Sequence, residues 1–403
     1  MKQRKTAPGA RSQLLLLACA MILGMTPWFS ATVTAPAMIA EWRTQASTSA
    51  WLTIAVQLGF VVGTCLSAIL LLSDRFSSRR IAAVSSLLAA VTTALLVWRH
   101  TGPTAAVALR GVTGIALAGV YPPGIKIAAG WWQTRRGTAI GVLVGALTIG
   151  SAAPNLFHLT TSAPEWRRVI VAASVAAVAS AGLFSFAIKE GPYQAESAPF
   201  DPRALFSVVR DRGVMLATGG YLGHMWELYA MWSSIGAFWS YIVLQRAASS
   251  TLAPVLAFIT IAAGTVGSIV AGIAADRVGR PVVTMIAMAV SGACALTIGL
   301  LTTAPLLALV AVAVVWGASI VADSAQFSAS VTELAPKRYV GTAITLQTCA
   351  GFLLTIVTIR LIPVWVELWG WKRAYMPLAI GPALGILSMW RLSRSHALAR
   401  ARE

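Results

Sequence analysis

Twelve long apolar runs, separated by short loops, most constrain what this chain can fold into. Their approximate limits are 12–39, 49–73, 81–98, 104–130, 138–160, 168–188, 214–244, 252–275, 282–302, 304–334, 342–366 and 374–391. A helix needs about 17 to 25 apolar residues to cross a bilayer, whereas barrel strands are shorter and alternate. Of the 403 residues, 57% are hydrophobic and only 11% charged. The sequence therefore predicts an all-α membrane protein.

Basic residues give the expected orientation of these spans. The formal net charge is +18, but the Lys and Arg residues are spread over short loops, so no basic domain is present to hold nucleic acid. If the N-terminus is cytoplasmic, 21 of them fall on that side, seven on the other and three within spans. This bias predicts a multi-pass inner-membrane protein with both termini cytoplasmic. The apolar run after the basic MKQRKTAPGAR segment is too long for a signal-peptide core.

The two halves of the chain repeat one another. The Asp-Arg pair at 74–75 recurs at 276–277, and the segment Gly-Thr-Ala-Ile at 137–140 recurs at 341–344, with offsets of 202 and 204 residues. Repeats of this kind are a transporter design. We therefore expect a six-helix bundle over 1–188, a cytoplasmic linker over 189–213 with a short interfacial helix, and a second bundle over 214–403. An ordinary solvated linker is the alternative.

The loop after the eighth span carries the motif GIAADRVGRP, residues 272–281. It resembles the G-x-x-x-D-R-x-G-R loop motif of the major facilitator superfamily, and the matching residues are Gly272, Asp276, Arg277, Gly279 and Arg280. The resemblance implies twelve transmembrane helices in two pseudo-symmetric bundles and a gating role for these residues. Asp276 could pair with Arg277 or Arg280, or accept backbone N–H groups.

The first-half copy of the motif, LLLSDRFSSRR, is degraded. Asp74 and Arg75 survive, but Leu70 and Ser77 stand at the glycine positions. The fourth span, ALRGVTGIALAG, also resembles that superfamily's fourth helix, whereas its glycine-proline antiport motif is missing from the fifth span. The superfamily resemblance covers the whole chain and leaves the substrate open.

Ionisable side chains within the spans are the candidate site residues, because each costs about 2.5–3.5 kcal/mol at the bilayer centre. Glu227 lies about 20 Å along the seventh span, near its middle, and His224 is three residues away on the same helix face. Tyr221 extends this face. We expect Glu227 to bind a proton or the substrate with His224 as its partner, or else to form a structural hydrogen bond.

Two cations lie in the fourth span. Arg110 is expected to be a counter-charge to the substrate or to Glu227, and a structural ion pair is the alternative. Lys126 follows Tyr121 and two prolines that should interrupt the helix near a cavity. It could bind an anionic substrate or extend to the inner interface.

Polar residues in other spans are weaker candidates. Asp323 belongs to a polar stripe in the tenth span that is expected to line the cavity, with packing between helices as the alternative. Gln57 and Gln347 lie in the second and eleventh spans. Deep tryptophans, Trp316 among them, are expected to pack the core or to wall a substrate pocket.

These features predict a secondary transporter that moves a small solute by proton-coupled alternating access. Arg110 and Lys126 favour an organic or inorganic anion. The alternatives are proton-driven efflux of drug-like or cationic compounds, and a non-transporting sensor on the same fold. The sequence indicates neither an enzyme, nor a cofactor, nor a metal site, and we expect a monomer in the lipid bilayer. The four cysteines show no metal-ligand or disulfide spacing.

Overall fold

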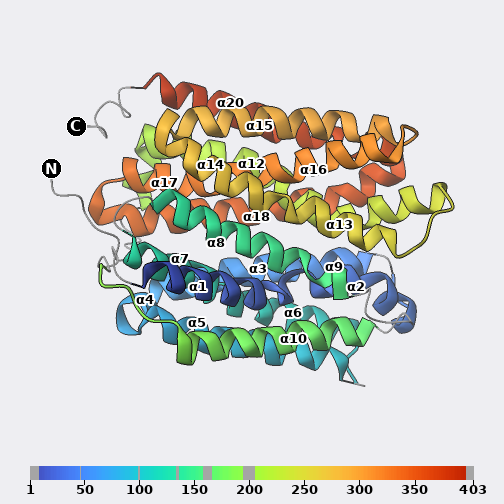
Figure 1. The fold of residues 1–403 in the computed structure, drawn as a ribbon, viewed down its shortest axis with the longest axis horizontal. Coiled ribbons are helices and arrows are strands. Elements are labelled where there is room, and N and C mark those ends of the chain that lie inside the picture. The colour runs from blue at the N-terminus through green and yellow to red at the C-terminus, as the bar shows by residue number, and fades with distance from the viewer. Residues whose placement is uncertain are drawn as a thin grey trace. The chain divides into compact units, whose positions relative to one another are not determined.

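The computed structural model describes residues 9–45, 47–98, 100–132, 136–157, 166–193 and 205–395. These residues form helices and connecting turns, with no strand among them. The chain forms two compact units: Met1–Glu196 with Thr251–Phe258 (unit 1), and Ser197–Ser250 with Ile259–Glu403 (unit 2). Within each unit the helices run side by side (Figure 1).

The twelve expected spans have helical counterparts, and seven of them are single continuous helices or nearly so. Unit 1 contains α3 (Ser47–Ile69), α5 (Ser78–Ala94) with η1 (Leu95–Val97), and α10 (Trp166–Gly182) with η3 (Leu183–Ala187). Unit 2 contains α12 (Arg212–Gln245), α15 (Arg280–Thr297) with η5 (Ile298–Leu301), α18 (Val340–Trp369) after η6 (Lys337–Tyr339), and α20 (Ile380–Ser393) after α19 (Trp371–Ala374) and η7 (Met376–Ala379).

The other five spans are each interrupted. They are α1 (Ala10–Met25) with α2 (Pro27–Trp42), α6 (Pro103–Leu117) with α7 (Tyr121–Trp131), α8 (Arg136–Ala152) with α9 (Pro154–Phe157), α13 (Leu252–Ala262) with α14 (Gly264–Val278), and α16 (Leu306–Ala322) with α17 (Ser324–Leu334). The predicted break before Lys126 is confirmed, because α7 starts with prolines in its first turn.

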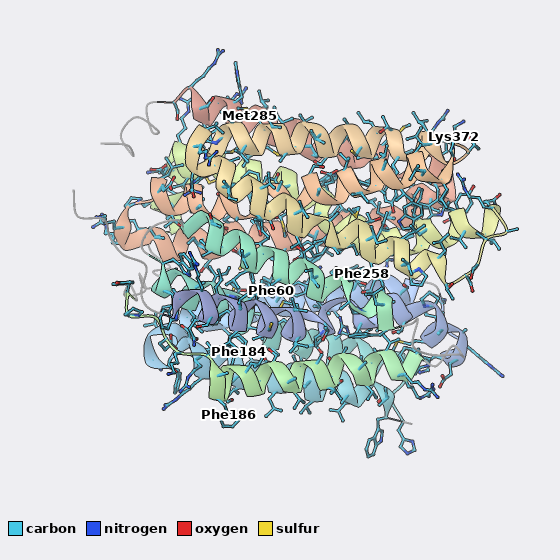
Figure 2. All side chains as sticks on the ribbon, in the orientation of Figure 1. Phe60, Phe184, Phe186, Phe258, Met285 and Lys372 are labelled. Atoms are coloured by element: carbon cyan, nitrogen blue, oxygen red, sulfur yellow. The ribbon has the colours of Figure 1, made fainter. Side chains whose placement is uncertain are left out.

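Ten of these helical segments are long and apolar enough to cross a membrane by length and composition. The two further segments of the twelve-helix layout are α12, which carries Glu227 and His224, and the segment from α19 to α20. Outward-facing apolar side chains fit a hydrocarbon surrounding. Phe186 is 89% exposed and projects from the edge of unit 1, whereas Phe184 on the same helical turn is fully buried (Figure 2).

Glycines make the same contact in both units. In unit 1, α3 and α6 touch so closely that a Cβ on Gly59 would lie 1.9 Å from the Gly111 carbonyl oxygen. In unit 2, α14 and α16 touch equally closely, and a Cβ on Gly267 would lie 1.8 Å from the Ala318 carbonyl oxygen. Small residues let membrane helices approach along their backbones. The second and fourth helices of each half therefore pack alike.

The linker segment α11 (Leu205–Arg210) forms the predicted short helix. Phe206 and Val209 are exposed, and the Arg210 guanidinium lies 3.9 Å from the centroid of the Phe206 ring. Asp211 then caps α12, since its carboxylate accepts a hydrogen bond from the Val214 backbone N–H at 2.9 Å.

Candidate functional site

Glu227 is the central feature of a buried polar cluster in unit 2. Its side chain is 1% exposed and lies midway along α12. The Trp316 Nε1–H donates to Oε1 at 2.6 Å, and the Ser291 hydroxyl donates to Oε2 at 2.9 Å. The two donors come from α16 and α15, so three helices hold one carboxyl group.

The Ser291 hydroxyl can serve either protonation state of this carboxyl group. Its oxygen also lies 3.3 Å from the Met288 carbonyl oxygen, which can only accept. When Glu227 is ionised, Ser291 donates to it. When Glu227 carries a proton on Oε2, that proton can be donated to Ser291, and Ser291 can donate to Met288. Both states are thus hydrogen-bonded without any heavy atom moving.

His224, on α12, contacts the junction between α16 and α17. Its Nδ1 is 2.8 Å from Asp323 Oδ1, and its Nε2 is 2.9 Å from the Ser324 hydroxyl. His224 and Asp323 are each 2% exposed. The Nδ1–Oδ1 contact has ion-pair distance without hydrogen-bond alignment. One imidazole therefore contacts the two consecutive residues at which the tenth span is interrupted.

This arrangement differs from the predicted pairing of His224 with Glu227. The two side chains share a helix face, as their spacing requires, but they contact different helices. Tyr221 and Phe327 surround the imidazole, with ring centroids 6.1 and 5.7 Å from it. Asp323, which the sequence predicts as a cavity residue, is thus a partner of His224 in the interior of unit 2.

Arg110 lies in the core of unit 1 and is fully buried. Its Nε donates to the Leu52 carbonyl oxygen at 3.3 Å and its Nη1 to that of Pro27 at 2.8 Å, and Nη2 donates to the Trp28 carbonyl oxygen. The guanidinium group thus joins α6 to α3 and to the first turn of α2. This placement favours a structural role over the predicted counter-charge role.

The remaining polar candidates fall into two groups. Lys126 and Tyr121 are half-buried on α7. Gln57 on α3 and Gln347 on α18 are fully buried, and neither amide group has a hydrogen-bond partner among the described residues. A buried amide without a partner costs about 1–3 kcal/mol, so each of these two positions calls for an additional hydrogen-bonding group.

The second-half loop motif connects α14 to α15. Gly279 adopts φ 89°, which favours glycine, and Gly272 is buried on α14. Arg280 donates to Glu333 Oε1 at 2.6 and 2.9 Å and to Gln326 Oε1 at 2.8 Å, so it ties α15 to α17. Asp276 and Arg277 are exposed. Asp276 has no side-chain partner among the described residues, which differs from the predicted pairing with arginine.

The first-half copy adopts a different loop. Ser77 stands at the glycine position with φ −63° and caps α5 by accepting from the Arg80 backbone N–H at 3.4 Å. Asp74 and Arg75 lie on the additional turn α4 (Leu72–Arg75), and Arg75 is exposed. The side chain of Asp74 lies outside the described part of the structure. The position of Gly279 thus has no positive-φ counterpart at Ser77, and the positive φ of the first-half loop lies at Leu71 instead, with φ 52°.

Three members of the buried cluster are absent from the sequence predictions as site residues: Ser291, Trp316 and Ser324. Each contacts an ionisable group on α12 from a helix at least 60 residues away in sequence. Trp316 was expected only to pack or to wall a pocket. A hydroxyl or an indole within an apolar run has no local signature that shows whether it hydrogen-bonds to a buried ionisable group or is an ordinary core residue.

The fold and sequence can be compared with known proteins. Residues 16–226 match the Major Facilitator Superfamily, whereas no curated protein matches this sequence. A solved structure of the major facilitator superfamily proton:xylose symporter XylE, bound to 6-bromo-6-deoxy-D-glucose, is similar with a TM-score of 0.77. The similarity covers 96% of each chain at 14% sequence identity, so it shows a shared fold.

The family match spans more than half of the chain, and the twelve-helix layout agrees with it. A multi-pass membrane transporter is the function that this family implies. The chain belongs to the major facilitator superfamily.

Proposed function

We propose that this protein is a proton-coupled secondary transporter of a small, neutral, polar solute, with Glu227 as the proton-exchanging carboxyl group. The solute and the proton would cross by alternating access of the two bundles. Asp323 and His224 would form a second ionisable unit beside Glu227. A sugar-like solute is the chemical class that these residues favour.

The hydrogen bonding of Glu227 is the observation that carries the proposal. The carboxyl group is 1% exposed, and both of its oxygens accept from neutral donors. A low-dielectric surrounding disfavours the ionised form, while the two donors favour it. The Ser291 hydroxyl can donate to the ionised carboxylate or accept from the protonated carboxyl group, so it stabilises both forms. Such a balance suits a group that must gain and lose a proton in each cycle.

The buried amides support a neutral solute. Arg110, one of the two cations behind the predicted anion, donates to three backbone carbonyl groups. Gln57 and Gln347 each offer one donor group and one acceptor atom, which suits hydroxyl-bearing compounds. The similar symporter XylE is described as a xylose transporter with a bound glucose derivative. Lys126 is the one of the two cations that still supports the alternative of an anionic solute.

Transport by purified protein in liposomes tests the proposal, with radiolabelled xylose, glucose and a set of small carboxylates as probes. A pH gradient should drive accumulation of a sugar probe by the unaltered protein. Glu227→Gln should abolish gradient-driven accumulation and retain exchange of labelled for unlabelled solute. Glu367→Gln is the matched control, because Glu367 is an exposed carboxylate on α18.

Two results would contradict the proposal. If Glu227→Gln accumulates solute as well as the control does, Glu227 does not couple the proton. If a carboxylate is transported and every sugar is not, the solute class is wrong and the anion alternative stands.

We also propose an inner-membrane location with both termini cytoplasmic, a monomeric protein, and solute contacts from Tyr121, Lys126 and Tyr221. The charge bias of the loops supports the orientation. Cysteine labelling of intact cells tests it: a cysteine at exposed Phe206 should react with an impermeant maleimide only after the cells are opened.

A further inference from the structure

The indole of Trp316 is held in place independently of the carboxyl group that it contacts. Trp316 is fully buried on α16, and its ring meets Tyr375 edge to face at 5.0 Å between centroids. The Tyr375 hydroxyl lies 3.0 Å from the Ser234 hydroxyl, and Ser234 is on α12, two turns after Glu227. The contacts form a closed loop from α12 through Trp316 and Tyr375 back to α12.

This bracing gives the two carboxylate oxygens of Glu227 different chemistry. An indole N–H is only a donor and keeps its proton at any physiological pH. Oε1, which receives that hydrogen bond, must therefore remain an acceptor. Oε2 faces the Ser291 hydroxyl, which can donate or accept. A proton arriving at Glu227 finds an acceptor beyond Oε2 and a fixed donor at Oε1.

We propose that Trp316 is a positioning residue for proton exchange: it reserves Oε1 as an acceptor, directs the proton to Oε2 and favours the ionised form of Glu227. This inference rests on the proposed function of Glu227. The indole makes a charge-assisted hydrogen bond to the carboxylate and a weaker, neutral one to the protonated group. Trp316 would thereby set the pH at which Glu227 exchanges its proton.

Other titratable groups face the same region from the neighbouring elements. They are His224 on α12, Asp323 at the α16–α17 junction, Cys294 on α15 and Tyr375 before η7. The charged residues Arg360 on α18 and Arg391 on α20 are exposed. Replacing Trp316 with phenylalanine changes none of these groups and keeps an aromatic ring against Tyr375.

Infrared spectroscopy of the full-length protein in liposomes, titrated with pH, tests the inference without knowledge of the solute. A protonated carboxyl group has a carbonyl-stretch band, and the band lost in Glu227→Gln belongs to Glu227. In Trp316→Phe, this band should persist to a pH about one unit higher, because a hydrogen bond to the ionised group is lost. The band should also move to a higher frequency, since its carbonyl loses a hydrogen bond.

Trp239→Phe is the matched control. Trp239 is also fully buried in unit 2, and its N–H donates to the hydroxyl of Thr260 at 3.0 Å. Because this hydroxyl does not titrate, Trp239→Phe should leave both the midpoint and the frequency unchanged. A purely structural role for Trp316 would lower the stability of the protein without moving either spectroscopic quantity.

The outcomes separate the two proposals. If Glu227→Gln removes a titrating band and Trp316→Phe leaves that band unaltered, the role of Trp316 is refuted while that of Glu227 stands. If Glu227→Gln removes no titrating band, both proposals fail. Should Trp316→Phe not fold, indole ¹⁵N labelling of the unaltered protein replaces it. One indole signal should then titrate with the infrared midpoint and cease to do so in Glu227→Gln; a set of pH-independent indole signals overturns the inference.

Discussion

His224 Nδ1 lies 2.8 Å from Asp323 Oδ1, and each of the two side chains is only 2% exposed. The contact joins the middle of α12 to the interruption of the tenth span. The same interruption begins α17, which carries Gln326 and Glu333, the partners of Arg280. The short helix α17 thus begins next to the His224–Asp323 contact, and its residues Gln326 and Glu333 form a charged clamp with Arg280 of α15.

The His224–Asp323 contact should contribute to stability as a coupled pair. Asp323→Asn should lower the free energy of unfolding by about 3 kcal/mol, because it removes one partner of a buried pair. The His224→Gln/Asp323→Asn double variant should lose less than the sum of the single variants, by about 0.5–3 kcal/mol. Denaturant unfolding in detergent measures these quantities.

The exposed pair Glu41–Arg167 supplies the comparison, since its side chains are 43% and 46% exposed. Glu41→Gln should change the free energy of unfolding by less than about 1 kcal/mol. Additive effects of the two substitutions at His224 and Asp323 would show that the pair contributes no coupling energy.

Gly114 should be essential to the packing of α3 against α6. A Cβ there would lie 2.2 Å from the Val56 carbonyl oxygen, so Gly114→Ala must push the two helices apart. The expected loss is about 1–3 kcal/mol of unfolding free energy. Gly111→Ala on the same helix is the control, because its nearest neighbouring atom would be 3.9 Å away. Thermal unfolding of the two variants should differ clearly, and equal midpoints would refute the close-contact argument.

Arg110 should behave as a structural residue. Lysine cannot reproduce the planar fork that reaches the carbonyl oxygens of Leu52, Pro27 and Trp28. Arg110→Lys should therefore lower the free energy of unfolding by about 2 kcal/mol. Arg277→Lys, at an exposed arginine near the end of α14, should have little effect. If Arg110→Lys keeps full stability and loses only solute binding, the predicted counter-charge role is correct instead.

Arg280 should keep the end of α17 closed against α15. Ser330 lies on α17 between Gln326 and Glu333 and is 4% exposed. In a variant without the natural cysteines, Ser330→Cys should react with a maleimide several-fold faster once Arg280→Gln removes the clamp. Arg277→Gln, at the neighbouring exposed arginine, should leave the labelling rate unchanged. If Ser330→Cys reacts at the same rate with and without Arg280→Gln, the clamp does not hold this segment.

The sequence by itself determined the membrane class, the twelve spans and the repeat. Span length and hydropathy suffice for these features because a bilayer requires each crossing segment to satisfy its own backbone hydrogen bonds. The break before Lys126 was also predictable, since two adjacent prolines cannot continue a helix. The loop motif also identified Gly279, at which the structure then showed a positive φ.

Only the tertiary structure decided which polar groups meet. Helical spacing placed His224 and Glu227 on one face, yet their partners come from α15, α16 and the α16–α17 junction. The three carbonyl oxygens that Arg110 contacts come from α2 and α3, and the sequence could not show that they converge on it. The physical reason is that spans are specified by local hydrophobicity, whereas hydrogen bonds between spans depend on the rotation and depth of each helix, which are fixed only when the helices pack.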